Sequence, residues 1–210
     1  MPRQKTKFQS EAIYHLSNIG NTGEDIFLTE DNYEYFLDKL FQKTKGVFEI
    51  LGYCLLPNQY HLIVKVKPVV VLKRTCAKRK YLNIRRLNFE KRNVPKFVSQ
   101  VMANFLNGYA RAFNRREGRK GSLFRENFRK VLLEGDDVLK EAIAEIMQMP
   151  VIEGIVSDKK DYPYISENRG LKMGRKQCKL LDDHYHNKWK AEKVGREGDD
   201  NWKKLIKVLE

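Results

Sequence analysis

The stretch from Phe48 to Lys67, FEILGYCLLPNQYHLIVKVK, decides the fold. Apolar and β-branched residues fill two arms, and the Pro57-Asn58 pair between them is a turn signal, so the stretch predicts a β-hairpin. Side chains alternate between the two faces of a strand. One face of the second arm therefore carries the expected core residues Tyr60, Leu62, Val64 and Val66. The other face carries Gln59, His61, Ile63, Lys65 and Lys67.

The composition is that of a folded, basic protein. The 210 residues allow one sizeable domain with an appendage, and 41% hydrophobic and 11% aromatic residues are enough for a core. No apolar run reaches the length of a membrane span, and the first residues lack the apolar core of a signal peptide. The three cysteines are scattered, which favours a reducing compartment. We therefore expect a cytoplasmic protein without a membrane partner.

The positive charge is concentrated in one part of the chain. Between Lys73 and Lys130 there are 18 Lys and Arg against three acids, which is more than the whole net charge of +14. A patch of like charges repels itself and destabilises the fold. Such a concentration predicts a polyanionic partner, and nucleic acid is the commonest one.

Sequence patterns predict the order of the other elements. We expect a strand at Ala12–Ser17, a helix from Asp31 to about Lys45 opened by a capping box of Asp31 and Glu34, a basic connection at about 68–95, a helix from Pro95 to about Arg116, a strand at Ser122–Glu134 and a helix from about Asp136 that Pro150 ends. This order predicts an α+β, ferredoxin-like antiparallel sheet with helices on one face.

The end of the chain is expected to be a separate segment. We predict a domain at 1–168 and a charged helical extension at 169–210, with amphipathic helices around 180–192 and 200–209. His184-Tyr185-His186 has the spacing of a metal-binding pair, but it lies in a polar stretch without strand character, and we interpret it as a chance occurrence.

Three motifs carry a resemblance to a known family. The first is GYCLLPNQYHL at residues 52–62. It resembles the hairpin of the REP-associated tyrosine transposases, a branch of the HUH transposases, whose pattern ends in PNH-[FY]-HL. In that family two histidines on one strand face bind a divalent metal, as suits the chemistry of imidazole. Here Gln59 stands at the first histidine position and His61 at the second.

The second motif is NGYARAFNRREGRKGSLFR at residues 107–125, with a basic stretch after it. It resembles the family's conserved helix end, turn and basic strand, and the likeness implies DNA contacts. Arg and Lys can neutralise phosphates there. The residues assigned to nucleic-acid binding are Arg111, Asn114, Arg115, Arg116, Arg119, Lys120, Arg125, Arg129 and Lys130.

The third motif spans residues 145–166, framed by Pro150, Gly154 and Asp161-Tyr162-Pro163. In active members a helix supplies the tyrosine that attacks a DNA phosphodiester, and an asparagine that helps hold the metal. In this frame the tyrosine position is Glu145 and the asparagine position is Met149. A carboxylate brings negative charge to a phosphate, and a thioether is a poor ligand for Mg²⁺.

The leading hypothesis is a DNA-binding protein for single-stranded or hairpin DNA that no longer cleaves it, with no cofactor and His61 as a vestigial ligand. The resemblance also implies a possible homodimer. One alternative is an active tyrosine transposase for DNA transposition that uses Mg²⁺ or Mn²⁺, with Gln59, His61 and Gln148 as ligands. The other is a structural protein associated with RNA or the ribosome.

Overall fold

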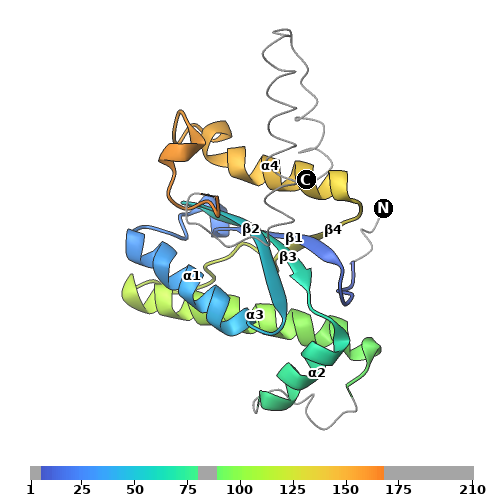
Figure 1. The fold of residues 1–210 in the computed structure, drawn as a ribbon. Helices are drawn as coiled ribbons and strands as arrows, with labels where there is room; N and C mark the ends of the chain where they lie inside the picture. The colour runs from blue at the N-terminus through green and yellow to red at the C-terminus, as the bar shows by residue number, and fades with distance from the viewer. Residues whose placement is uncertain (1–5, 80–88, 168–210) are drawn as a thin grey trace, which may run out of the picture. The chain divides into compact units, whose positions relative to one another are not determined.

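The computed structural model describes residues 6–79 and 89–167, which form a four-stranded antiparallel sheet with helices packed on it (Figure 1). The strands are β1 (Ile13–Ile19), β2 (Phe48–Leu56), β3 (Gln59–Val66) and β4 (Arg129–Leu133). The helices are α1 (Glu30–Thr44), α2 (Val69–Lys78), α3 (Val94–Arg116) and α4 (Asp136–Ile152). The strand order is β2-β3-β1-β4. The expected α+β, ferredoxin-like class is confirmed.

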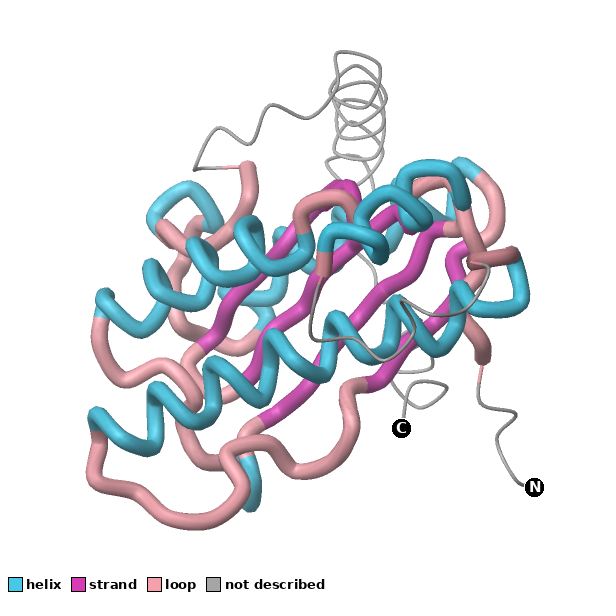
Figure 2. Tube along the Cα trace, turned by 90° about the horizontal axis from the view of Figure 1, so that it is seen from below, coloured by secondary structure: helices cyan, strands magenta, loops and turns pink. Residues whose placement is uncertain are grey.

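The hairpin forms as the sequence predicts, with β2 and β3 joined at Pro57-Asn58. All four expected core residues of β3 are fully buried. Burying a side chain of this size stabilises a fold by about 1.5–3 kcal/mol. Helices α1 and α3 lie over this face of the sheet and cross in front of the strands in Figure 2. The alternation within β3 therefore separates a packed face from a polar one.

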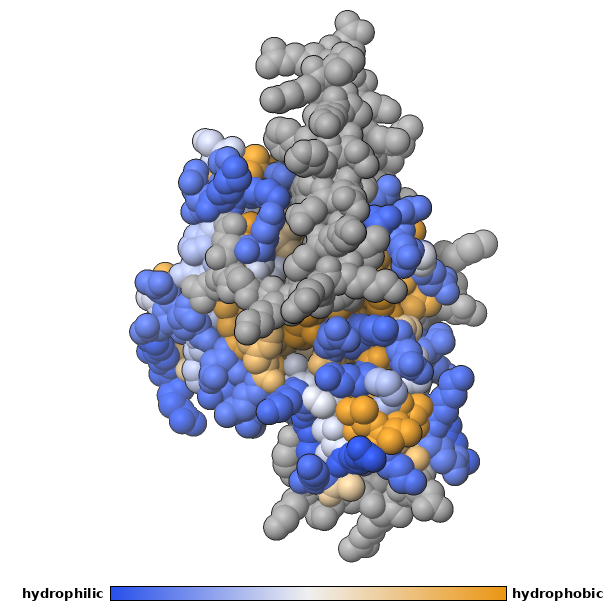
Figure 3. Space-filling model, in the orientation of Figure 1, coloured by the Kyte–Doolittle hydropathy of each residue, from blue (hydrophilic) through white to orange (hydrophobic). Residues whose placement is uncertain are grey.

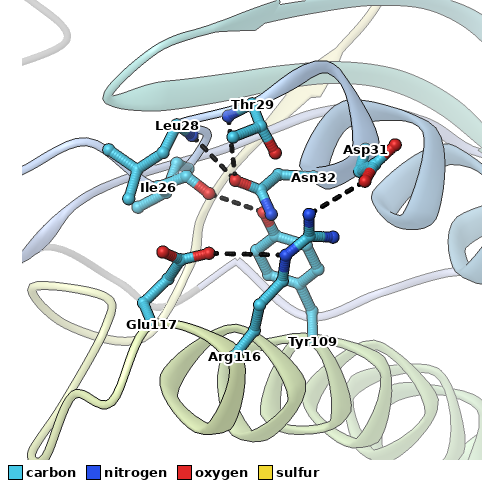
Figure 4. Close-up of polar contacts among 8 residues, drawn as sticks. All are labelled: Ile26, Leu28, Thr29, Asp31, Asn32, Tyr109, Arg116 and Glu117. Atoms are coloured by element: carbon cyan, nitrogen blue, oxygen red, sulfur yellow. Dashed lines mark hydrogen bonds and ion pairs between the residues drawn. The ribbon is translucent and has the colours of Figure 1, made fainter.

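Aromatic side chains fill the space between α1, α3 and the sheet. Phe36 of α1 is central, with ring centroids of Tyr60, Phe105 and Tyr109 at 5.3, 5.0 and 5.0 Å. The Tyr109 hydroxyl donates a hydrogen bond of 2.5 Å to the backbone oxygen of Ile26 (Figure 4). Such ring pairs add stability beyond their buried area.

Helix α1 begins one residue before the prediction, and its capping residues differ. The Asn32 side-chain oxygen accepts hydrogen bonds from the backbone N–H groups of Leu28 and Thr29, at 2.9 and 3.1 Å (Figure 4). The expected capping box of Asp31 and Glu34 was wrong by about two residues, because Thr29 is the residue before the first helical turn. Asp31 instead contacts Arg116 of α3.

Helix α4 lies on the opposite face of the sheet from α1 and α3 (Figure 1). A Cβ built on Gly52 of β2 would sit 3.4 Å from Met147 and 3.5 Å from Ile146, so these two side chains rest on the sheet. The expectation of helices on one face thus holds for α1 and α3, and α4 adds a cover on the other. Ile63, on the polar face of β3, is fully buried for this reason.

Two predicted boundaries were wrong. The strand expected at Ser122–Glu134 is confined to β4, because the preceding residues cross the end of β1: Asn21 donates to the Leu123 oxygen and Arg125 to the Ile19 oxygen. Pro150 does not end α4, which continues to Ile152. A proline in the last turn removes only one hydrogen bond, and its own oxygen accepts from the N–H of Ile155 at 2.9 Å.

The basic connection predicted after the hairpin opens with the short helix α2. Thr75 of α2 donates to the Gly46 oxygen at 3.0 Å, and Arg79 donates to the Lys43 oxygen at 2.6 Å. These contacts attach α2 to the end of α1. The predicted extension at 169–210, with its helices around 180–192 and 200–209 and the triplet His184-Tyr185-His186, lies outside the described residues.

The surface agrees with the charge of the sequence. Most of the described side chains on the side shown in Figure 3 are hydrophilic, and apolar ones gather in a band across the middle and in a smaller patch below it. None of the helices in the described ranges is long and apolar enough to cross a membrane.

Two glycines should respond to alanine in opposite ways. A Cβ on Gly20 would lie 1.8 Å from the backbone oxygen of Glu24, whereas one on Gly108 in α3 meets nothing within 4 Å. We expect Gly20→Ala to lower the free energy of unfolding by about 2 kcal/mol or more. Gly108→Ala should raise it by up to about 1 kcal/mol, because alanine costs less entropy in a helix. Urea denaturation of both variants checks this, and equal effects would contradict it.

Candidate functional site

A row of polar side chains crosses the sheet on the face opposite α1 and α3. Gln59 and His61 come from β3 and His15 from β1, whose Ser17 pairs with His61. The Nε2 atom of His15 lies 3.0 Å from Nδ1 of His61, and Nε2 of His61 lies 3.3 Å from Oε1 of Gln59. The two imidazole rings stack with centroids 5.2 Å apart. We call these three side chains the histidine row.

The hydrogen bonds of the histidine row fix its protons. The side-chain oxygen of Gln59 can only accept, so Nε2 of His61 carries a hydrogen. In a neutral ring Nδ1 of His61 is then the acceptor, and Nε2 of His15 is the donor. Burial lowers the pKa of His15 to about 4, with Arg129 adding to the effect. Burial lowers the pKa of His61 to about 3, with His15 and Arg129 contributing. Both rings are therefore neutral at pH 7.

The histidine row does not fit a divalent metal. A ligand nitrogen must offer a lone pair, and His61 uses both ring nitrogens within the chain. His15 and Gln59 also lie at opposite edges of the His61 ring, so the three cannot converge on one ion. Within residues 6–79 and 89–167, no cluster of three or more His, Cys, Asp or Glu side chains could hold a metal.

The predicted residues of the third motif lie on α4, which packs over β2 and β3 on the face of the histidine row. Glu145, Gln148 and Met149 are each half-buried there. The side chains of α4 that rest on the sheet are Ile146 and Met147. The sequence placed these residues on a helix that forms, and their roles in chemistry stay predictions.

Three buried tyrosines are poor candidates for a replacement nucleophile. Tyr60 is fully buried on the α1 side of the sheet, and burial raises its pKa. Burial likewise raises the pKa of Tyr109, whose hydroxyl bonds to Ile26. Tyr162 donates to the Leu55 oxygen at 2.7 Å. A phenol becomes a strong nucleophile only when its proton is easily lost, so all three are poorly suited to attack a phosphate.

The nine predicted nucleic-acid residues divide into groups. Arg111, Asn114 and Arg125 line a groove between α3 and residues 121–128, with a volume of about 550 Å³. Arg129 projects on the histidine-row side, because it pairs with Ser17 in the sheet. Lys130 points to the other side, with its ammonium 5.2 Å from the centre of the Phe8 ring. Arg115 and Lys120 are exposed at the end of α3 and in the turn after it.

Two of the nine predicted nucleic-acid residues, both arginines, have acidic partners within the described part of the chain. Arg116 contacts Asp31 at 2.8 Å and Glu117 at 3.7 Å (Figure 4), and Arg119 contacts Glu24. Exposed ion pairs contribute about 0–1 kcal/mol each. A phosphate could therefore displace either acid at small cost, but these two arginines are poorer candidates than Arg111 and Arg125.

Asn114 has a structural task in the same region. Its amide nitrogen donates to the Gly121 oxygen at 2.8 Å, and its backbone oxygen accepts from the N–H of Arg119 at 2.8 Å. These bonds close the turn between α3 and residue 121. The prediction of Asn114 as a nucleic-acid contact stays untested, and its hydrogen bonds indicate that it shapes the groove wall.

Sequence reasoning missed His15. The alternation of Tyr14 and Leu16 in the core placed residue 15 on the polar face, but nothing in the sequence gave the register between β1 and β3. A shift of one residue would have sent His15 to the other face. The pairing of Ser17 with His61 is thus the feature that brings the two imidazoles together.

Comparison with known proteins supports the architecture. No family model and no curated protein matches this sequence. Among solved structures, the chain is similar to a REP-associated tyrosine transposase bound to a REP hairpin, with 14% identity, a TM-score of 0.52, and coverage of 83% of this chain and 87% of that one. At this identity the likeness defines the fold, which is a distant tyrosine-transposase-like fold.

The free energy of unfolding should fall with decreasing pH more steeply than the protonation of carboxylates alone explains. In the unfolded chain both histidines take up protons near pH 6.5, whereas in the folded protein their pKa values are lowered to about 4 and 3. Folding is thus favoured above pH 6.5 and loses this contribution as pH falls towards 4. We expect a loss of about 1 kcal/mol per histidine between pH 7 and pH 5, allowing for their partial exposure. Denaturant titrations at several pH values, on the unaltered protein and on a His15→Asn, His61→Asn double variant, check this prediction. If the free energy of unfolding changes with pH equally in both proteins, the prediction is contradicted.

Divalent metal should leave the unaltered protein unchanged. Because His61 has no free lone pair, about 1 mM Mn²⁺ should not raise the midpoint of thermal unfolding. Gln59→His replaces the accepting amide by an imidazole, and this variant should show a rise. If Mn²⁺ raises the unfolding midpoint of the unaltered protein and His61→Ala abolishes the effect, then the histidine row does bind a metal and the prediction is refuted.

Proposed function

We propose that this chain is a transposase-like DNA-binding protein that holds single-stranded or hairpin DNA and does not cut it. The DNA would lie on the basic edge, by which we mean the surface that carries Arg111, Arg115 and Arg125. The observation that carries the proposal is the pairing of two features on one fold. Exposed arginines surround a groove beside α3. The three side chains of the histidine row bond to one another at the position where the resembling family holds its metal.

The basic edge supports the first half of the proposal. Arg111, Arg115 and Arg125 are exposed, and each presents a guanidinium suited to bidentate phosphate contacts. The similar solved structure holds a REP hairpin. DNA is therefore the partner we propose for this chain, and a homodimer remains a proposal from the resemblance alone.

The histidine row supports the second half. Strand cleavage in the resembling family needs a metal to polarise the phosphate and a tyrosine to attack it. Here the candidate ligand His61 is bonded on both sides, and Glu145 stands at the nucleophile position. The alternative of an active enzyme with Gln59, His61 and Gln148 as ligands requires breaking both hydrogen bonds of His61.

A covalent adduct would separate these two functions. Labelled hairpin DNA with a single-stranded tail, incubated with the protein and about 1 mM Mn²⁺, should run as free DNA on a denaturing gel. The same mixture should show a shifted complex on a native gel. A band that survives denaturation and disappears on proteinase treatment would overturn the proposal in favour of the active transposase.

Binding should depend steeply on salt. Each arginine that neutralises a phosphate adds about 0.9 to the slope of log affinity against log salt. Arg111→Gln and Arg125→Gln should each weaken binding and reduce the slope by about 1. Lys43→Gln, an exposed change at the far end of α1, serves as the matched control and should change neither value. A slope near zero in the unaltered protein would refute the assignment of the basic edge.

The alternative of an RNA-associated protein uses the same arginines. Nucleic acid that copurifies with the protein distinguishes the two partners by its sensitivity to DNase or RNase. Exclusive sensitivity to RNase would replace DNA by RNA as the partner.

A further inference from the structure

Four unpaired side chains face the groove between α3 and residues 121–128. Asn107 and Arg111 are four residues apart on α3 and so lie on one face of that helix. Arg125 and Asn127 come from the opposite wall, just before β4. Each wall therefore presents one amide and one guanidinium. All four are exposed, and within the described part of the chain none of their side chains has a hydrogen-bond or ion-pair partner.

Two other amides in the same groove are already engaged. Asn18 donates to the Glu126 backbone oxygen at 3.0 Å, and its own oxygen accepts from the N–H of Ile19 at 2.9 Å. Asn114 bonds to Gly121. These two hold the walls in place, so the groove is rigid at its base while Asn107 and Asn127 keep free donors and acceptors.

The bottom of the groove is apolar. Leu106, Leu123 and Phe124 are buried beneath it, and Phe128 is half-buried at its edge. A planar, weakly polar group would cover this floor favourably, as bases do on aromatic side chains. A phosphate group would make no favourable contact with this apolar floor. Glu126 also lines the groove, and its carboxylate would repel a phosphate but accept a hydrogen bond from an exocyclic amine.

We infer that this groove holds a single unpaired base of the bound DNA and reads its edge. Asn107 and Asn127 would hydrogen-bond the base, and Arg111 and Arg125 would hold the adjoining phosphates. The volume of about 550 Å³ lies within the range of pockets that enclose a small planar ligand. This inference rests on the proposed function. It adds a preference for particular bases, which binding through charge alone would not give.

The experiment measures base preference separately from affinity. Hairpin DNAs with a short single-stranded tail, each tail position occupied in turn by the four bases, are titrated by fluorescence anisotropy at about 150 mM salt. The unaltered protein should prefer one base at one tail position by about tenfold or more, the value of one good bidentate contact. The Asn107→Ala, Asn127→Ala double variant should lose that preference. Its salt slope should stay unchanged, because neither asparagine carries a charge.

Two further variants keep the result interpretable. Asn104→Ala, one turn earlier on α3 and bonded to Gln100 outside the groove, should retain the preference. Arg111→Lys keeps the charge but loses the planar fork that holds a phosphate, so it should weaken binding to all tails alike, keep the base preference and change the salt slope little. Circular dichroism verifies that each variant is folded.

The outcomes separate this inference from the proposed function. Binding without base preference, or a double variant that keeps the preference, overturns the base site and leaves DNA binding intact. Failure of the unaltered protein to bind any of the DNAs overturns both. Stronger binding of RNA tails with the same dependence on Asn107 and Asn127 overturns the assignment to DNA.

Discussion

The alternation of side chains along β3 is the constraint on which the rest of this molecule depends. Tyr60 and Leu62 have to face α1 and α3, where their burial supplies part of the core. Gln59 and His61 are then obliged to face the other way, towards β1 residue 15 and helix α4. A slip of one residue would bury the polar pair and expose the core, so the stability of the fold itself holds the histidine row in place.

That geometry explains how the site can change its chemistry while the scaffold stays intact. An imidazole at position 59 could share an ion with His61, but the Gln59 amide oxygen accepts a hydrogen bond from His61 instead. Nδ1 of His61 is then left as an acceptor, and Nε2 of His15 donates a hydrogen bond to it. A neutral, internally bonded row satisfies half-buried polar groups that would otherwise be costly. In this arrangement the three side chains satisfy one another's hydrogen-bonding groups.

Short-range chemistry in the sequence predicts much of this fold. The hairpin, the long helix α3 and the burial of Tyr109 follow from spacing, because each depends on neighbours within a few residues. The contact of His15 with His61 does not, because it depends on the register between strands 46 residues apart. The sequence also did not reveal the groove, because Asn107 and Asn127 line it together only where residues 121–128 cross the end of β1.

Under the proposed function, binding and cleavage would depend on two surfaces that lie apart in the fold. The groove and its arginines belong to α3 and the segment before β4, whereas the histidine row belongs to the sheet face under α4. Substitutions at positions 59, 145 and 149 therefore leave the groove residues and their supporting hydrogen bonds untouched. Because the groove arginines lie outside the histidine row, a change at position 59 would leave the phosphate contacts of the proposed function in place.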